Sequence, residues 1–357
     1  MRRSSLLLAA GMIVIAIPSG LSTARPETGD EVLSQAQQTF GPLPDNMANP
    51  KYPLTPERVD LGRKLFFDPR ISADGAVSCS RCHLPALYGT DGLAKPLGAH
   101  DRVNPRNAPT ILNAALQFAE HWRGDRVDVE DQAKQSLIGP PSFGNADYAA
   151  AMAKLKAIPG YAPLFDKAFP GQSDPITPDN WGQAIGAYER TLVTPSRFDD
   201  YLRGNASALS DREKNGLHLF MEKGCIGCHN GPGVGGGMFR KFGVMEDYWK
   251  ETGASEPDKG RFDVTKDPAD LYVFKVPSLR NVAMTGPYFH DGSVKRLPEA
   301  VRIMGQVQLG QSLTSAEIGD ITAFLASLTG KLPADFVAAP VLPPSGLPDV
   351  NTQDLQH

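Results

Sequence analysis

Two units of the pattern Cys-x-x-Cys-His constrain this chain more than any other feature of its 357 residues. The first runs from Cys79 to His83 and the second from Cys225 to His229, and they use all four cysteines. In this pattern the thiols form thioethers with haem, and the histidine that follows ligates the iron. The sequence therefore predicts two covalently bound haem c groups, attached at Cys79, Cys82, Cys225 and Cys228, with His83 and His229 as iron ligands.

A zinc site is the alternative interpretation of these units, because paired cysteines also bind zinc. The two units lie 146 positions apart (79 to 225), and each ends in a histidine. This spacing fits a zinc site poorly, so haem remains the prediction.

The first 24 residues are typical of a secretory signal peptide. Arg2 and Arg3 precede an apolar run, and a small-residue cleavage site follows at Ser22-Thr23-Ala24. The run from Leu6 to Ile17 is too short to cross a bilayer, which takes roughly 20 residues. We therefore expect a periplasmic protein without a membrane span once the signal is removed. No cysteine is left for a disulfide, which agrees with haem attachment outside the cytoplasm.

The charge balance argues against nucleic acid as a partner. The formal net charge is −4, whereas nucleic-acid binding favours a basic face.

Helix signals precede both units. Thr55-Pro56-Glu57 and the capping box Ser210 to Glu213 each predict a helix start. Apolar spacing predicts further helices from Pro178 to Leu192 and from Thr314 to Leu328. Strand signals are few and short. We therefore expect a mainly α fold of two cytochrome c-like domains with one haem each. The predicted division is a signal peptide over 1–24, domains over 25–200 and 201–332, and an extended proline-rich tail over 333–357.

The segments around these units resemble the bacterial di-haem cytochrome c peroxidases, a superfamily that includes the MauG-type maturation enzymes. The resemblance runs from about Leu54 to Leu332. It is carried by Gly75 to His83, Arg106 to Trp122, Lys223 to Gly231 and Phe274 to Gly292, which includes the runs Val276 to Asn281 and Pro287 to Gly292.

The resemblance implies unequal roles for the two haems. The His83 haem would meet peroxide, and the His229 haem would accept electrons with Met304 as its second axial ligand. The MauG-type enzymes carry a tyrosine where this chain has Met304. His100 would be a removable distal ligand of the first iron, with His121 as the less favoured alternative.

The same resemblance implies further site residues. Trp122 would relay electrons between the haems, and Gln132 would line the peroxide pocket. Asn107 and the backbone carbonyls of Thr285 and Pro287 would bind one Ca²⁺ near the domain interface, because calcium prefers oxygen ligands. The resemblance also implies a homodimer.

The chain departs from the family at Ser142. The peroxidases place a glutamate ten residues after the pocket glutamine, where it serves as general acid and base, and this chain has serine there. The predicted function is reduction of hydrogen peroxide to water with electrons from a small cytochrome c or cupredoxin. The lost carboxylate raises a MauG-like alternative, in which peroxide drives oxidation of a tryptophan or tyrosine on a partner protein. A plain electron carrier is the third alternative.

Overall fold

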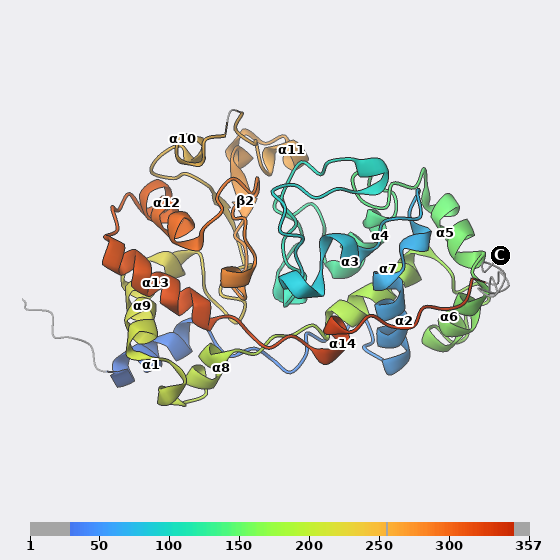
Figure 1. The fold of residues 1–357 in the computed structure, drawn as a ribbon, viewed down its shortest axis with the longest axis horizontal. Helices are drawn as coiled ribbons and strands as arrows, with labels where there is room; N and C mark the ends of the chain where they lie inside the picture. Colours follow the sequence, from blue (N-terminus) through green and yellow to red (C-terminus); the bar gives the residue numbers. More distant parts are fainter. Residues whose placement is uncertain (1–28, 255, 346–357) are drawn as a thin grey trace, which may run out of the picture.

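The computed structural model describes residues 29–254 and 256–345, so the predicted signal peptide and the last part of the tail lie outside the described residues. The described chain is mainly helical and forms two lobes side by side (Figure 1). Within those residues, no helix is both long and apolar enough to cross a bilayer.

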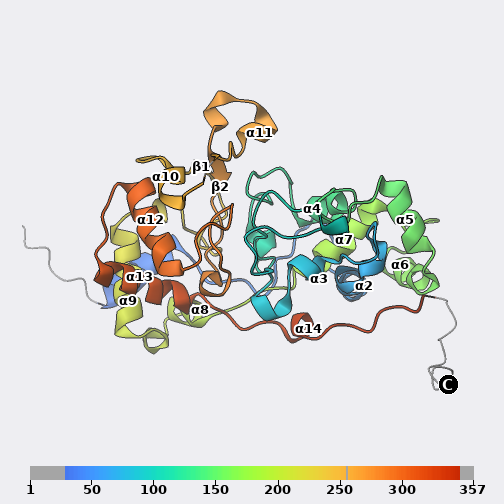
Figure 2. The ribbon, with the colours of Figure 1, turned by 45° about the horizontal axis from the view of Figure 1, so that its top comes forward.

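The first lobe holds α2 to α7 and the second holds most of the remaining elements, as both views show (Figures 1 and 2). In the first lobe the helices are α2 (Pro56–Phe67), α3 (Cys79–Cys82), α4 (Val129–Ser136), α5 (Tyr148–Lys156), α6 (Ala162–Ala168) and α7 (Pro178–Glu189). The later helices are α8 (Arg197–Leu202), α9 (Asp211–Glu222), α10 (Tyr248–Thr252), α11 (Phe262–Thr265), α12 (Leu297–Leu309), α13 (Ser315–Ser327) and α14 (Ala334–Val337). The expected scarcity of strands is confirmed in the described part, where β1 (Phe239–Lys241) and β2 (Val273–Lys275) form one antiparallel pair.

The predicted helix starts are confirmed. Thr55 caps α2 by accepting a hydrogen bond from the Arg58 amide, and Ser210 and Glu213 form the capping box of α9. Thr314 and Glu317 form another capping box at the start of α13. These side chains satisfy backbone N–H groups that the first helical turn leaves free.

The helix before each Cys-x-x-Cys-His unit crosses a later helix at very close range. A Cβ atom at Gly62 of α2 would lie 1.8 Å from the Ala184 carbonyl oxygen of α7. A Cβ atom at Gly216 of α9 would lie 1.9 Å from the Asp320 carbonyl oxygen of α13. Only glycine permits these crossings, and the two lobes therefore repeat one packing arrangement.

Packing does not follow chain order at the N-terminus. The helix α1 (Gly29–Thr39), which the predicted division assigns to the first domain, packs in the second lobe. Its Val32 and Ala36 share a core with Phe198 of α8 and Phe324 of α13.

The C-terminal segment crosses in the opposite direction and lies along the first lobe (Figures 1 and 2). The prediction of a wholly extended tail is wrong for α14, because Phe336 is fully buried against Phe66 and Tyr188 and anchors a helical turn. Arg63 donates hydrogen bonds to the Asp335 and Ala338 carbonyls, which hold the turn in place.

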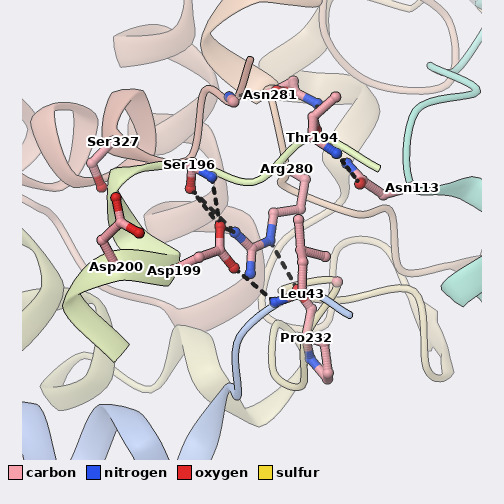
Figure 3. Close-up of polar contacts among 12 residues, drawn as sticks. Leu43, Asn113, Thr194, Ser196, Asp199, Asp200, Pro232, Arg280, Asn281 and Ser327 are labelled. Carbon is pink, nitrogen blue, oxygen red and sulfur yellow. Dashed lines mark hydrogen bonds and ion pairs between the residues drawn. The ribbon is translucent and has the colours of Figure 1, made fainter. Parts of the chain in front are cut away.

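A fully buried ion pair ties the second lobe together (Figure 3). Arg280 Nη1 lies 2.8 Å from Asp199 Oδ2, and Arg280 Nε donates to the Pro232 carbonyl at 2.8 Å. The amides of Leu43 and Ser196 donate to the same carboxylate at 2.8 and 2.7 Å. Burial alone would raise the pKa of Asp199, but the Arg280 charge and these amides lower it overall.

Removing the charge of Asp199 should destabilise the protein strongly. Asp199→Asn leaves Arg280 buried without its counter-charge, which costs about 3–5 kcal/mol. Urea unfolding of the haem-loaded protein, followed by circular dichroism, measures this loss. The matched control is Asp174→Asn, because the Asp174–Lys156 pair is exposed and such pairs contribute about 0–1 kcal/mol. Equal losses in the two variants would contradict the assignment.

Acid sensitivity of the fold should depend on Glu213. A hydrogen bond from Arg197 and the cap of α9 lower the pKa of Glu213 to about 2 from its ordinary 4.5. The unfolded chain therefore binds more protons between these values, so stability is lost as pH falls from about 4.5 to about 2. Unfolding of Glu213→Gln across this range should show a shallower pH dependence. Glu57→Gln, in the exposed first turn of α2, is the control and should keep the dependence.

Candidate haem and peroxide site

The first Cys-x-x-Cys-His unit forms α3, and His83 caps the C-terminal end of that helix. The Nδ1 atom of His83 lies 2.9 Å from the Gly89 carbonyl oxygen, to which it donates. This bond fixes the tautomer that leaves Nε2 free as a metal ligand. Burial lowers the pKa of His83, although the Gly89 carbonyl opposes the shift. Burial thus favours the neutral form of the imidazole, which is the form that ligates a metal.

The second unit begins in the turn Cys225–Gly227 and ends at His229, which is buried. Burial lowers the pKa of His229 to about 4, and the carbonyls of Val234 and Pro277 partly oppose this shift. His229, Cys225 and Cys228 all line one large cavity.

Met304 lines the same cavity from α12, together with Ala300 and Val301. The other side chains around it are largely apolar and include Phe220, Leu297 and Leu325. A cavity that presents two thiols, a neutral histidine and a thioether within apolar walls suits a haem with histidine and methionine ligands. The residues present therefore fit the cofactor that the sequence predicts.

Trp122 reaches this cavity from the first half of the chain. Its Nε1 atom donates to the Asn107 carbonyl at 3.0 Å, and its own carbonyl accepts from the Lys275 amide of β2 at 2.8 Å. Its ring centroid lies 6.3 Å from that of His290. The structure thus places Trp122 where the two halves of the chain meet.

Three residues predicted to bind calcium also line the cavity, namely Asn107, Thr285 and Pro287. The Asn107 side chain donates to the Leu93 carbonyl at 2.8 Å. Within the described residues, no group of three or more His, Cys, Asp or Glu side chains could hold a metal ion. A calcium site here would depend on backbone carbonyls, and it stays a prediction.

His100 is exposed and does not line the cavity. It lies in the turn Ala99–Asp101 with a left-handed backbone, and its amide donates to Asp74 at 2.7 Å. The Ala99 amide donates to the Ser142 carbonyl at 2.8 Å, so this turn rests on the loop that contains Ser142. The role of His100 as a distal ligand stays a prediction.

Gln132 of α4 contacts His121, the histidine that the family resemblance favours less than His100. The Nε2 atoms of the two side chains are 3.5 Å apart. His121 lines the cavity next to Trp122, and its Nδ1 atom lies 3.3 Å from Asp125 Oδ1. In the sequence, the contact between His121 and Asp125 is indicated by their spacing of four residues.

Known proteins are similar to this chain over most of its length. The family model described as di-haem cytochrome c peroxidase matches residues 56–207. Cytochrome c551 peroxidase of Pseudomonas aeruginosa is 40% identical over 96% of this chain and 97% of its own length. The chain belongs to the di-haem cytochrome c peroxidase family.

As a member of this family, the protein is a haem-dependent oxidoreductase. The MauG side of the family is also similar. Methylamine utilization protein MauG of Methylorubrum extorquens is 36% identical over 83% of this chain and 82% of its own length. The crystal structure of a MauG-like protein associated with microbial copper homeostasis is 31% identical, covers 84% of this chain and 97% of its own, and superposes with a TM-score of 0.74.

The cavity that His229 and Met304 line should not tolerate a side chain at Gly235. Its φ is +120°, and a Cβ atom there would lie 2.4 Å from the Pro277 oxygen and 3.0 Å from His229 Nδ1. Backbone strain alone would cost about 1–3 kcal/mol. Gly235→Ala should lower thermal stability and alter the haem absorption spectrum.

Gly237→Ala is the matched control for this loop, because nothing lies within 4 Å of a Cβ atom at Gly237. Spectra and haem content per chain of the control should match those of the parent protein. A normal haem spectrum in Gly235→Ala would show that the loop does not set the position of His229.

Proposed function

We propose that this enzyme is a periplasmic di-haem peroxidase that reduces hydrogen peroxide to water with electrons from a small cytochrome c or cupredoxin. The observation that carries the proposal is the shared cavity of His229 and Met304. Methionine ligation raises the reduction potential of a haem, which suits the acceptance of electrons from a soluble donor.

The four cysteines would attach the two haems, and His83 and His229 would ligate their irons. When bound, the haems supply the redox chemistry. The protein supplies neutral imidazole ligands, an apolar surround and the junction at Trp122. Peroxide would react on the His83 side, where Gln132 and His121 lie together. His100 would cap this side at rest, and a calcium ion held through Asn107 would brace the junction.

The MauG-like alternative is favoured by Ser142, which cannot act as a proton acceptor near neutral pH. In that alternative, peroxide oxidises a tryptophan or tyrosine of a partner protein. Mass spectrometry of a candidate partner after peroxide treatment distinguishes the two, because only this alternative leaves a modified residue that requires both haems.

Steady-state turnover tests the favoured function directly. The haem-loaded enzyme should oxidise reduced cytochrome c when peroxide is added, in the resting or the half-reduced state. The expected stoichiometry is two cytochromes per peroxide, because reduction of peroxide to two waters takes two electrons. Absence of turnover in both states would refute the proposal.

Replacing Trp122 tests the junction between the haems. Trp122→Phe keeps an aromatic ring but loses the indole and its bond to Asn107, and we expect kcat to fall by about tenfold or more. Trp181→Phe is the control, since Trp181 also donates to a backbone carbonyl, that of Ala133 at 3.2 Å, but lies in the core of the first lobe. Its kcat should stay near that of the parent enzyme.

A further inference from the structure

The side chain of His121 is held in a defined orientation beside the cavity. Its Nδ1 atom faces Asp125 Oδ1 at 3.3 Å. The other carboxylate oxygen of Asp125 accepts from Arg123 at 3.2 Å and from Arg126 at 2.8 Å. Burial raises the pKa of Asp125, but His121 and the two arginines lower it overall, so the carboxylate is charged. A charged carboxylate fixes the proton of His121 on Nδ1.

The opposite nitrogen of His121 is therefore a proton acceptor. It faces the amide nitrogen of Gln132, which can only donate, at the long distance of 3.5 Å. A small molecule that offers a better donor would displace this contact. The His121 side chain is 37% exposed, so such a molecule can reach it.

His121 also lies near the first haem ligand. Thr90, which lines the cavity together with His121, directly follows Gly89, whose carbonyl accepts the hydrogen bond from His83 Nδ1. His121 lines the cavity with Thr90, Pro109 and Trp122, all from the first half of the chain.

Among the residues of the first half that line the cavity in the described structure, His121 alone has an ionisable side chain, and the others are Thr90, Asn107, Ala108, Pro109, Thr110, Gln117 and Trp122. Glu120 and Glu189 are also buried in the first half, where burial raises the pKa of both, to about 8 for Glu120, but neither lines the cavity. Glu130, which precedes Gln132, is buried in a two-bond ion pair with Arg190 at 2.7 and 2.8 Å. Ser142 stands where the family has its glutamate.

We propose that His121, oriented by Asp125, is the general acid and base of this enzyme. It takes the place of the glutamate that the family carries at the position of Ser142. The inference rests on the proposed function. His121 Nε2 would take a proton from one peroxide oxygen and return it to the other, which would leave as water when the O–O bond breaks. The bound haems would supply the two electrons of this cleavage, and the reduced cytochrome donor would replace them. The second oxygen would leave as water with two protons from solvent.

Ligand binding to the haem-loaded enzyme tests the proton transfer apart from turnover. Hydrogen cyanide must lose a proton to a base when it binds ferric iron, whereas carbon monoxide binds ferrous iron without a proton. The variant His121→Asn is suited to the test because His121 has a left-handed backbone, with φ +64°, and asparagine tolerates that region. His121→Gln serves as a second variant if haem content or folding of the first is impaired.

We expect both variants to slow peroxide cleavage and cyanide association with the half-reduced enzyme by about 10² to 10⁴-fold. Carbon monoxide binding to the reduced enzyme should stay within about twofold, since no proton moves. His218→Gln is the control, because His218 lies on α9 of the second lobe beside Glu222. It should match the parent enzyme in all three measurements.

The other possible results of these measurements would each overturn either the role of His121 or the proposed function. Parent-like cyanide binding in the His121 variants would overturn the role of His121 while the peroxidase function stood. Equal loss of cyanide and carbon monoxide binding would also overturn it, because the side chain would then shape the pocket and not move protons. If the parent enzyme neither turned over peroxide nor bound cyanide, the proposed function itself would fail.

Discussion

The buried pair of Arg280 and Asp199 is the interaction on which the second lobe depends. It joins four separate parts of the chain, since the carboxylate also accepts the Leu43 amide and the guanidinium also reaches the Pro232 carbonyl. Pro232 lies three residues after His229, and Arg280 lies three residues after Pro277, whose carbonyl is next to the His229 ring. Desolvating two charges is costly unless both are well paired. The pair therefore fixes the loops around His229 in one arrangement.

The two lobes share one packing arrangement. Each must place a short turn with two cysteines and a histidine beside an apolar helix crossing, and each does so with a glycine at the crossing, Gly62 or Gly216. The surroundings of the two histidines differ. The Gly89 carbonyl accepts a hydrogen bond from His83 Nδ1, whereas His229 shares a cavity with Met304 of α12. The difference between the two sites thus arises from the loop after His83 and from α12 beside His229, on a shared helical scaffold.

Local signals in the sequence are enough to predict the starts of α2, α9 and α13, because capping depends on adjacent residues. Long-range packing has no such signal. The placement of α1 in the second lobe and the burial of Phe336 depend on contacts between residues more than a hundred positions apart. Sequence spacing also cannot show which histidine faces Gln132. The structure shows that contact for His121, while the assignment of His100 rests on resemblance alone.

The helix α1 packs in the second lobe, and Phe336 of α14 packs in the first. These parts of the fold therefore cannot form in the order in which the chain is synthesised. Phe336 completes a cluster with Phe66, Ile111 and Tyr188, and Cys79 packs against that cluster. The surroundings of the first attachment unit are therefore finished only when residues near the end of the chain arrive. Both Cys-x-x-Cys-His units, at 79–83 and 225–229, therefore precede in the chain the residue that completes the cluster around Cys79.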